Sequence, residues 1–136
     1  RSAEMAGAGP VRDTAAMISG MDPALVPGEV AFASFPGADP GALPEARALV
    51  REAEGVTLVL PVGHPALPEG VLAMRQITLR VASALDGVGL TAAVATALAE
   101  AGIPCNVIAG FHHDHVFVPA HRAEEALAAL RRRAAR

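Results

Sequence analysis

The stretch from Met74 to Arg133 constrains the fold most, because its apolar residues switch repeatedly between the period of a strand and that of a helix. MRQITLRVASAL, residues 74–85, alternates apolar and polar positions, which predicts a half-buried strand with Gln76, Thr78 and Arg80 facing the solvent. DGVGLTAAVATALAEAG then predicts a helix that ends at a glycine. IPCNVIAGF and HVFVP are typical of strands, and AHRAEEALAALRRR closes the stretch with a second helical repeat. The predicted order is therefore β-α-β-β-α.

The first half of the chain predicts a shorter β-α-β arrangement. EVAFASF is apolar on both faces and VTLVLPV is rich in β-branched residues, so both are typical of strands. Between them, Leu43–Gly55 spaces its apolar residues three to four positions apart and ends on a glycine, which predicts a helix. A short helix is expected over residues 11–21, followed by proline-rich turns over residues 21–29.

Hairpins combined with split β-α-β units describe an α+β, ferredoxin-like sandwich, with an antiparallel sheet and helices on one face. We expect an N-terminal half at residues 11–63, a linker at 64–71 and a C-terminal domain at 72–134. Residues 1–10 are rich in Ala, Gly and Pro and are expected to be disordered, or to be a remnant of expression.

The composition limits the function classes. The chain has 136 residues, 52% of them hydrophobic, which suffices for one domain or for two small halves that share a core. No membrane span is expected, because charges, Gly or Pro interrupt every apolar segment. A net charge of −3 and 3% aromatic residues do not provide the basic, aromatic face of nucleic-acid-binding proteins. The absence of lysine excludes Schiff-base and P-loop chemistry, while a single cysteine and no signal-peptide pattern predict a cytoplasmic protein.

The turn ALDGVGLTAA, where the strand leads into the helix, carries the clearest ligand-binding signal. Its glycines at 87 and 89 let the backbone approach a ligand closely, and the unpaired N–H groups of the first helical turn attract anions. A carboxylate suits such a site. The alternative interpretation is that both glycines serve only the bend.

Three separated motifs, REAEGVTLVLP, GLTAAVATALAEAGIPCNVIAG and HDHVFVP, resemble in order and spacing a small bacterial group of stand-alone ACT-domain proteins with two ACT-like halves. The resemblance covers residues 21–130. It implies an ACT-type fold, a regulatory and non-enzymatic role, and a homodimer formed through the ACT sheets. The group usually has a histidine and a serine before the turn, where this chain has Ala82 and Ser83, and an aromatic residue in the hairpin, where this chain has His112.

The resemblance also implies a binding site for a small molecule, expected to be an amino acid, and no cofactor. The implied ligand residues are Asp86, Gly87, Val88, Gly89 and Leu90 of the turn, with Asn106, Val107 and Ile108 of a neighbouring strand. The backbone amides after Asp86 would accept the α-carboxylate, and Asp86 or Asn106 would hold the α-amino group.

The histidines of AGFHHDHVFVP support a second hypothesis, a metal-binding protein or small metalloenzyme. His113 and His115 share one face of a strand, and Asp114 or His121 would supply a further ligand. A tight turn between two strands explains the same residues without a metal, and no H-E-x-x-H spacing is present. A third hypothesis is a structural interaction module, in which paired ACT sheets bind a partner protein.

Overall fold

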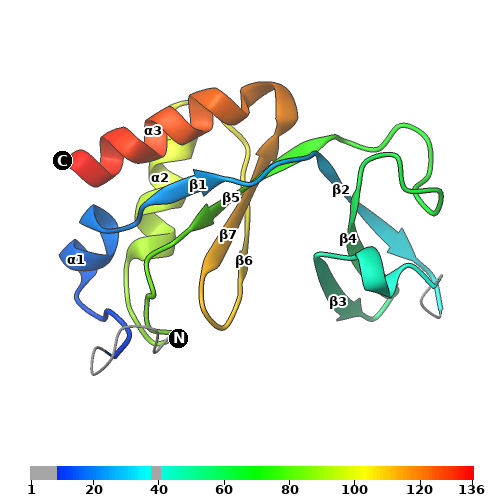
Figure 1. Cartoon of the computed structure of the whole chain (residues 1–136), viewed down its shortest axis with the longest axis horizontal. Coiled ribbons are helices and arrows are strands. Elements are labelled where there is room, and N and C mark those ends of the chain that lie inside the picture. Colours follow the sequence, from blue (N-terminus) through cyan, green and yellow to red (C-terminus); the bar gives the residue numbers. More distant parts are fainter. Residues whose placement is uncertain (1–8, 38–40) are drawn as a thin grey trace.

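The computed structural model describes residues 9–37 and 41–136, and within these residues the strands form one seven-stranded antiparallel sheet (Figure 1). The expectation for residues 1–10 falls largely on residues 1–8, which lie outside this description. The C-terminal half confirms the predicted β-α-β-β-α order. Its elements are β5 (Met74–Leu79), α2 (Leu90–Glu100), β6 (Asn106–Ala109), β7 (Asp114–Pro119), the 3₁₀ turn Ala120–Arg122 and α3 (Ala123–Ala135).

A fourth strand of this unit comes from the N-terminal half. β1 (Pro23–Leu25) pairs antiparallel with the end of β5, so that Pro23 lies opposite Leu79. The prediction of turns alone over residues 21–29 is therefore wrong. Three residues between prolines are too few to show alternation, and only the pairing with β5 defines the strand. The preceding helix α1 (Thr14–Ser19) is shorter than predicted and starts at Asp13, whose carboxylate accepts the N–H of Ala16 at 2.9 Å.

The other three strands extend the sheet from β5 outward in the order β2, β4, β3. Their bounds are β2 (Val30–Phe35), β3 (Ala48–Glu52) and β4 (Gly55–Pro61). The predicted helix at Leu43–Gly55 is wrong, because only Leu43–Glu45 forms a 3₁₀ turn and β3 pairs with β4 along its whole length. Gly55 is not a helix cap: a Cβ atom there would lie 2.5 Å from the carbonyl oxygen of Phe35.

The helices α1, α2 and α3 cover one face of the C-terminal strands (Figure 1). Ile77, Leu79, Val116 and Val118 point from β5 and β7 into this largest core cluster. On the opposite face Phe117 meets Phe32 of β2 edge to face, with ring centroids 5.2 Å apart.

Because β2 and β4 curl over this second face, the predicted exposure of Gln76 is wrong. The Gln76 side chain is buried, and its carbonyl oxygen accepts a hydrogen bond from Arg47 at 3.1 Å. Arg80, also predicted to face solvent, is exposed and pairs with Asp22.

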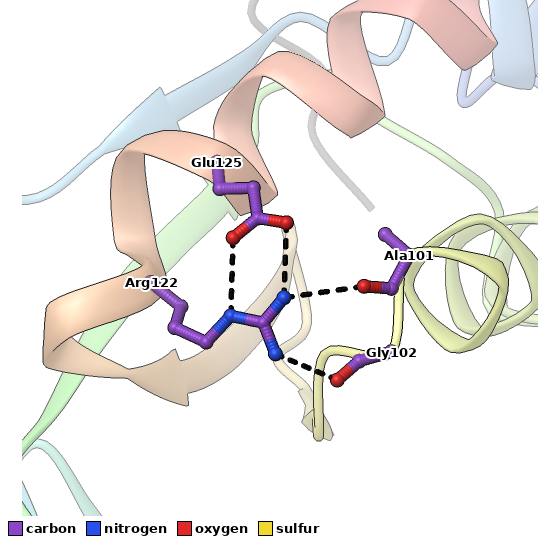
Figure 2. Close-up of polar contacts among 4 residues, drawn as sticks. All are labelled: Ala101, Gly102, Arg122 and Glu125. Atoms are coloured by element: carbon purple, nitrogen blue, oxygen red, sulfur yellow. Dashed lines mark hydrogen bonds and ion pairs between the residues drawn. The ribbon is translucent and has the colours of Figure 1, made fainter.

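Arg122 ties the start of α3 to the end of α2 (Figure 2). Its guanidinium donates to the carbonyl oxygens of Gly102 at 2.7 Å and Ala101 at 3.2 Å, and to both carboxylate oxygens of Glu125 at 3.1 and 2.9 Å. These bonds satisfy helix-end carbonyls that lack an intrahelical partner. The hydrogen bond from Arg122 holds the pKa of Glu125 below its ordinary value.

Candidate functional site

The strand-to-helix turn predicted from the sequence forms the N-terminus of α2. Gly89 is the N-cap with φ of +106°, and no side chain caps the helix there. Leu90, the first helical residue, is buried and anchors the turn, whereas Thr91 is exposed. The amides of the first turn have no carbonyl partner within the helix, so they and the helix dipole favour a negatively charged group.

The segment from Val11 to Met17 packs directly on this turn. Val11 forms a parallel bridge with Ser83, and the Thr14 hydroxyl donates to the carbonyl oxygen of Val88 at 2.6 Å. A Cβ at Gly89 would lie 2.6 Å from the Thr14 methyl carbon, and one at Gly87 would lie 2.9 Å from the Met17 sulfur. Gly89 is therefore required by its positive φ and its close contact with Thr14, whereas a side chain at Gly87 would displace the flexible end of Met17.

A cavity of about 180 Å³ opens between the turn and its neighbours. It is lined by Met17 of α1, by residues 83–85, by the two turn glycines, by the first two residues of α2, and by Ala109 and Asp114 of the β6–β7 pair. Ser83 is 2% exposed and Asp114 is 5% exposed, so two polar side chains are buried here. Within residues 9–37 and 41–136 the Ser83 hydroxyl makes no hydrogen bond. The cavity thus combines an anion-attracting helix end, a carboxylate and a hydroxyl.

The structure brings only part of the predicted ligand set to this cavity. Gly87, Gly89 and Leu90 line it. Asp86 is exposed and pairs with Arg12, with 3.2 Å between Nε and Oδ1, while Val88 is 75% exposed.

The predicted neighbours Asn106, Val107 and Ile108 lie along β6 and do not belong to the cavity lining. Sequence reasoning did not assign Ser83 or Met17 to the site. It considered Asp114 as a metal ligand or as a residue of the tight turn between the two strands. No local signal marks these three side chains as neighbours, because pairing and packing bring them to the turn.

The residues of the histidine cluster do not converge. Asp114 shares the helix-covered face of β7 with Val116, whereas His115 points to the opposite face, as alternation along a strand requires. Its Nδ1 lies 2.9 Å from the Thr78 hydroxyl and 3.1 Å from the Gln76 amide nitrogen. Among the described residues no three His, Cys, Asp or Glu side chains form a metal-binding group.

A larger hollow of about 620 Å³ lies between the C-terminal ends of α2 and α3. Its lining consists of alanines with Glu100 and exposed or half-exposed arginines, and it contains no buried polar side chain. The smaller cavity is the better candidate, because buried polar groups orient a ligand and alanines do not.

Cys105, the chain's one cysteine, packs beside the main core, and burial raises the pKa of its thiol. It therefore resembles a small apolar residue more than a nucleophile.

Two family models of the ACT domain match the chain, one over residues 10–64 and the other over residues 71–132. Among curated proteins, none matches the sequence. A Vibrio cholerae protein of unknown function, described as a possible transport protein, has a similar structure with a TM-score of 0.76 and 44% identity, covering 85% of this chain and 92% of that one.

Two further solved structures share the fold at low identity. An Agrobacterium tumefaciens protein has a TM-score of 0.67 at 19% identity, covering 82% of this chain and 87% of its own. The ligand-free regulatory subunit of aspartate kinase from Thermus thermophilus has a TM-score of 0.59 at 15% identity, covering 82% and 95%.

The fold and the matched models define a regulatory, ligand-binding class of domain. The chain belongs to the ACT-domain family, and both of its halves match that family. This confirms the resemblance inferred from the three sequence motifs. None of the described helices has the length and apolar character needed to cross a membrane.

Proposed function

We propose that this protein is a non-enzymatic sensor that binds an amino acid in the cavity at the N-terminus of α2. The observation that carries the proposal is the shared lining: the uncapped helix end, buried Ser83 and buried Asp114 line one cavity. Membership in a family of regulatory ligand-binding domains supports the same role.

The charges of an amino acid zwitterion match two parts of the cavity lining. The α-carboxylate accepts hydrogen bonds from the first-turn amides of α2, including that of Thr91. The α-ammonium group pairs with the carboxylate of Asp114. Asp86 and Asn106, which the family resemblance implied for the ammonium group, are both exposed, and Asp86 already pairs with Arg12.

The assembly and the domain division remain part of the proposal. We propose a homodimer that forms through the ACT sheets, since β6 and β3 end the strand order and leave one edge each for pairing. The matched ranges support a division into an N-terminal half at residues 11–63 and a C-terminal domain at 72–134. A cytoplasmic setting suits the single cysteine, Cys105.

The test uses one substitution at two positions of the same helix. Thr91→Glu places a carboxylate in the first turn of α2, where it favours the helix but repels a ligand carboxylate. Thr96→Glu is the matched control, because Thr96 is exposed on α2 outside the cavity. Wild type and both variants are screened by thermal shift with the twenty amino acids and with Zn²⁺, Ni²⁺, Co²⁺ and Mn²⁺, each metal with and without a chelator.

A ligand at a hundredfold excess over Kd stabilises the native state by about 2.7 kcal/mol, which a thermal shift detects. We expect a shift with one class of amino acid in the wild type and in Thr96→Glu, and none in Thr91→Glu. A shift that survives Thr91→Glu contradicts the proposed site. A shift only with a metal, reversed by the chelator, favours the metal hypothesis, and no shift at all favours the interaction module.

A further inference from the structure

The size of the cavity at the α2 N-terminus limits what it can hold. Its volume of about 180 Å³ is well below the roughly 300–1,000 Å³ of pockets that hold drug-sized ligands. A cavity of this size suits a ligand with few non-hydrogen atoms better than a drug-sized one. Glycine, alanine, serine and threonine fall near this size, whereas lysine, arginine and the aromatic amino acids exceed it.

Two buried side chains, Met17 and Leu90, bound the cavity. Met17 is 1% exposed and packs with its sulfur beside the backbone of Gly87, where an added Cβ would lie 2.9 Å from it. Leu90 is 4% exposed and is fixed as the first residue of α2. Interiors packed this closely do not expand without cost when a larger ligand enters.

Ser83 gives the cavity a chemical preference as well as a size limit. Its side chain is 2% exposed, it lines the cavity, and within the described part of the chain its hydroxyl has no hydrogen-bond partner. Its immediate cavity neighbours Ala84 and Met17 are apolar. A buried hydroxyl without a partner is unfavourable, so a ligand that supplies one is preferred over an apolar ligand of the same size.

We infer that the site selects a small amino acid whose side chain carries a hydroxyl group, serine or threonine, and that Ser83 recognises this hydroxyl. The inference rests on the proposed function, because the α-carboxylate and α-ammonium groups occupy the helix end and Asp114 as described there. When the α-carboxylate and the α-ammonium group occupy these positions, the short side chain of the ligand is the part that contacts Ser83.

Calorimetric titration of the purified full chain with individual amino acids tests this inference. The panel consists of glycine, alanine, serine and threonine against leucine, lysine, phenylalanine and arginine. Ser83→Ala removes only the hydroxyl, and because that hydroxyl is unpaired in the ligand-free chain, the variant is expected to fold. Ser34→Ala is the control, since Ser34 is exposed on β2 and lies outside the cavity.

We expect serine or threonine to bind at least about tenfold more tightly than alanine, and the large amino acids not to bind. Ser83→Ala should reduce the preference over alanine to about twofold or less, while Ser34→Ala leaves it unchanged.

Tightest binding of lysine, arginine, leucine or phenylalanine overturns the size selection and leaves the amino-acid site intact. Equal binding of alanine and serine, or an equal loss of all affinities in Ser83→Ala, overturns the recognition of the hydroxyl. Absence of binding by every amino acid refutes the proposed function and this inference together, so the two failures are distinguishable.

Discussion

Replacing Gly89 with alanine tests whether the contact between α1 and the strand-to-helix turn determines stability. A side chain at φ of +106° carries backbone strain of about 1–2 kcal/mol. The new Cβ would also lie 2.6 Å from the methyl carbon of Thr14. That methyl can rotate away only if the Thr14 hydroxyl gives up its bond to the Val88 carbonyl oxygen, a further loss of about 1 kcal/mol. The expected destabilisation is therefore about 2–3 kcal/mol.

Two further substitutions separate these contributions. Gly63→Ala introduces the same kind of strain, since Gly63 has φ of +96°, but a Cβ there meets no atom within 4 Å. It should cost only about 1–2 kcal/mol. Thr14→Ser removes the methyl group and keeps the hydroxyl, so the double variant with Gly89→Ala should recover about 1 kcal/mol.

The assay is urea denaturation followed by far-UV circular dichroism, because the chain has no Trp or Tyr for fluorescence. Additivity of Thr14→Ser and Gly89→Ala within about 0.5 kcal/mol would refute the proposed contact.

Two other contacts give predictions of their own. Arg122→Gln should lower the urea midpoint, because it weakens the bonds to the end of α2. Arg122 lowers the pKa of Glu125 from its ordinary value of 4.5, so its stabilisation is present above that value and is lost as the pH falls through the lower, folded value. Denaturation at about pH 6 and about pH 3.5 should therefore show a smaller acid-induced loss in Arg122→Gln than in the wild type. For His115, nitrogen-15 NMR should place the proton on Nε2, because Gln76 directs its NH₂ at Nδ1. A proton on Nδ1 contradicts this network.

Local patterns predicted the C-terminal half well because its elements carry strong and different periods. In α2, for example, Leu90, Val94 and Leu98 are spaced as one helical face and all three are buried. The helical period of α2 therefore predicts which of its residues are buried, since a single hydrophobic core covers one side of the helix.

The segment at β3 shows why the same reasoning failed in the first half. Its residues fit a helical period, but Leu49 lies opposite Leu58 on β4 and packs with the core beneath that strand. Pairing with β4 supplies hydrogen bonds and burial that outweigh a weak helical preference. Leu58 lies outside the segment from which the helix was predicted. Only knowledge of the pairing with β4 would therefore have corrected that prediction.

The candidate site was predictable to the extent that it is local. Gly87, Gly89 and Leu90 lie within four residues of one recognisable turn, and they line the cavity. Ser83 and Asp114 are thirty-one positions apart, and the β5–β7 pairing and the turn together bring them to one cavity. A periodic pattern or a local motif in one sequence does not predict that two such distant residues line the same cavity.

The position of α1 explains how a ligand in this cavity would influence both halves of the chain. A six-residue helix is too short to be stable alone, so α1 depends on its packing against the turn, α2 and α3. Met17 of α1 lines the cavity, and the same segment leads through β1 into β2 of the N-terminal strands. A ligand that contacts Met17 and the α2 N-terminus therefore stabilises the packing of α1 on the turn. Because α1 precedes β1 and β2 directly, under the proposed function that stabilisation would act on the segment that leads into the N-terminal strands.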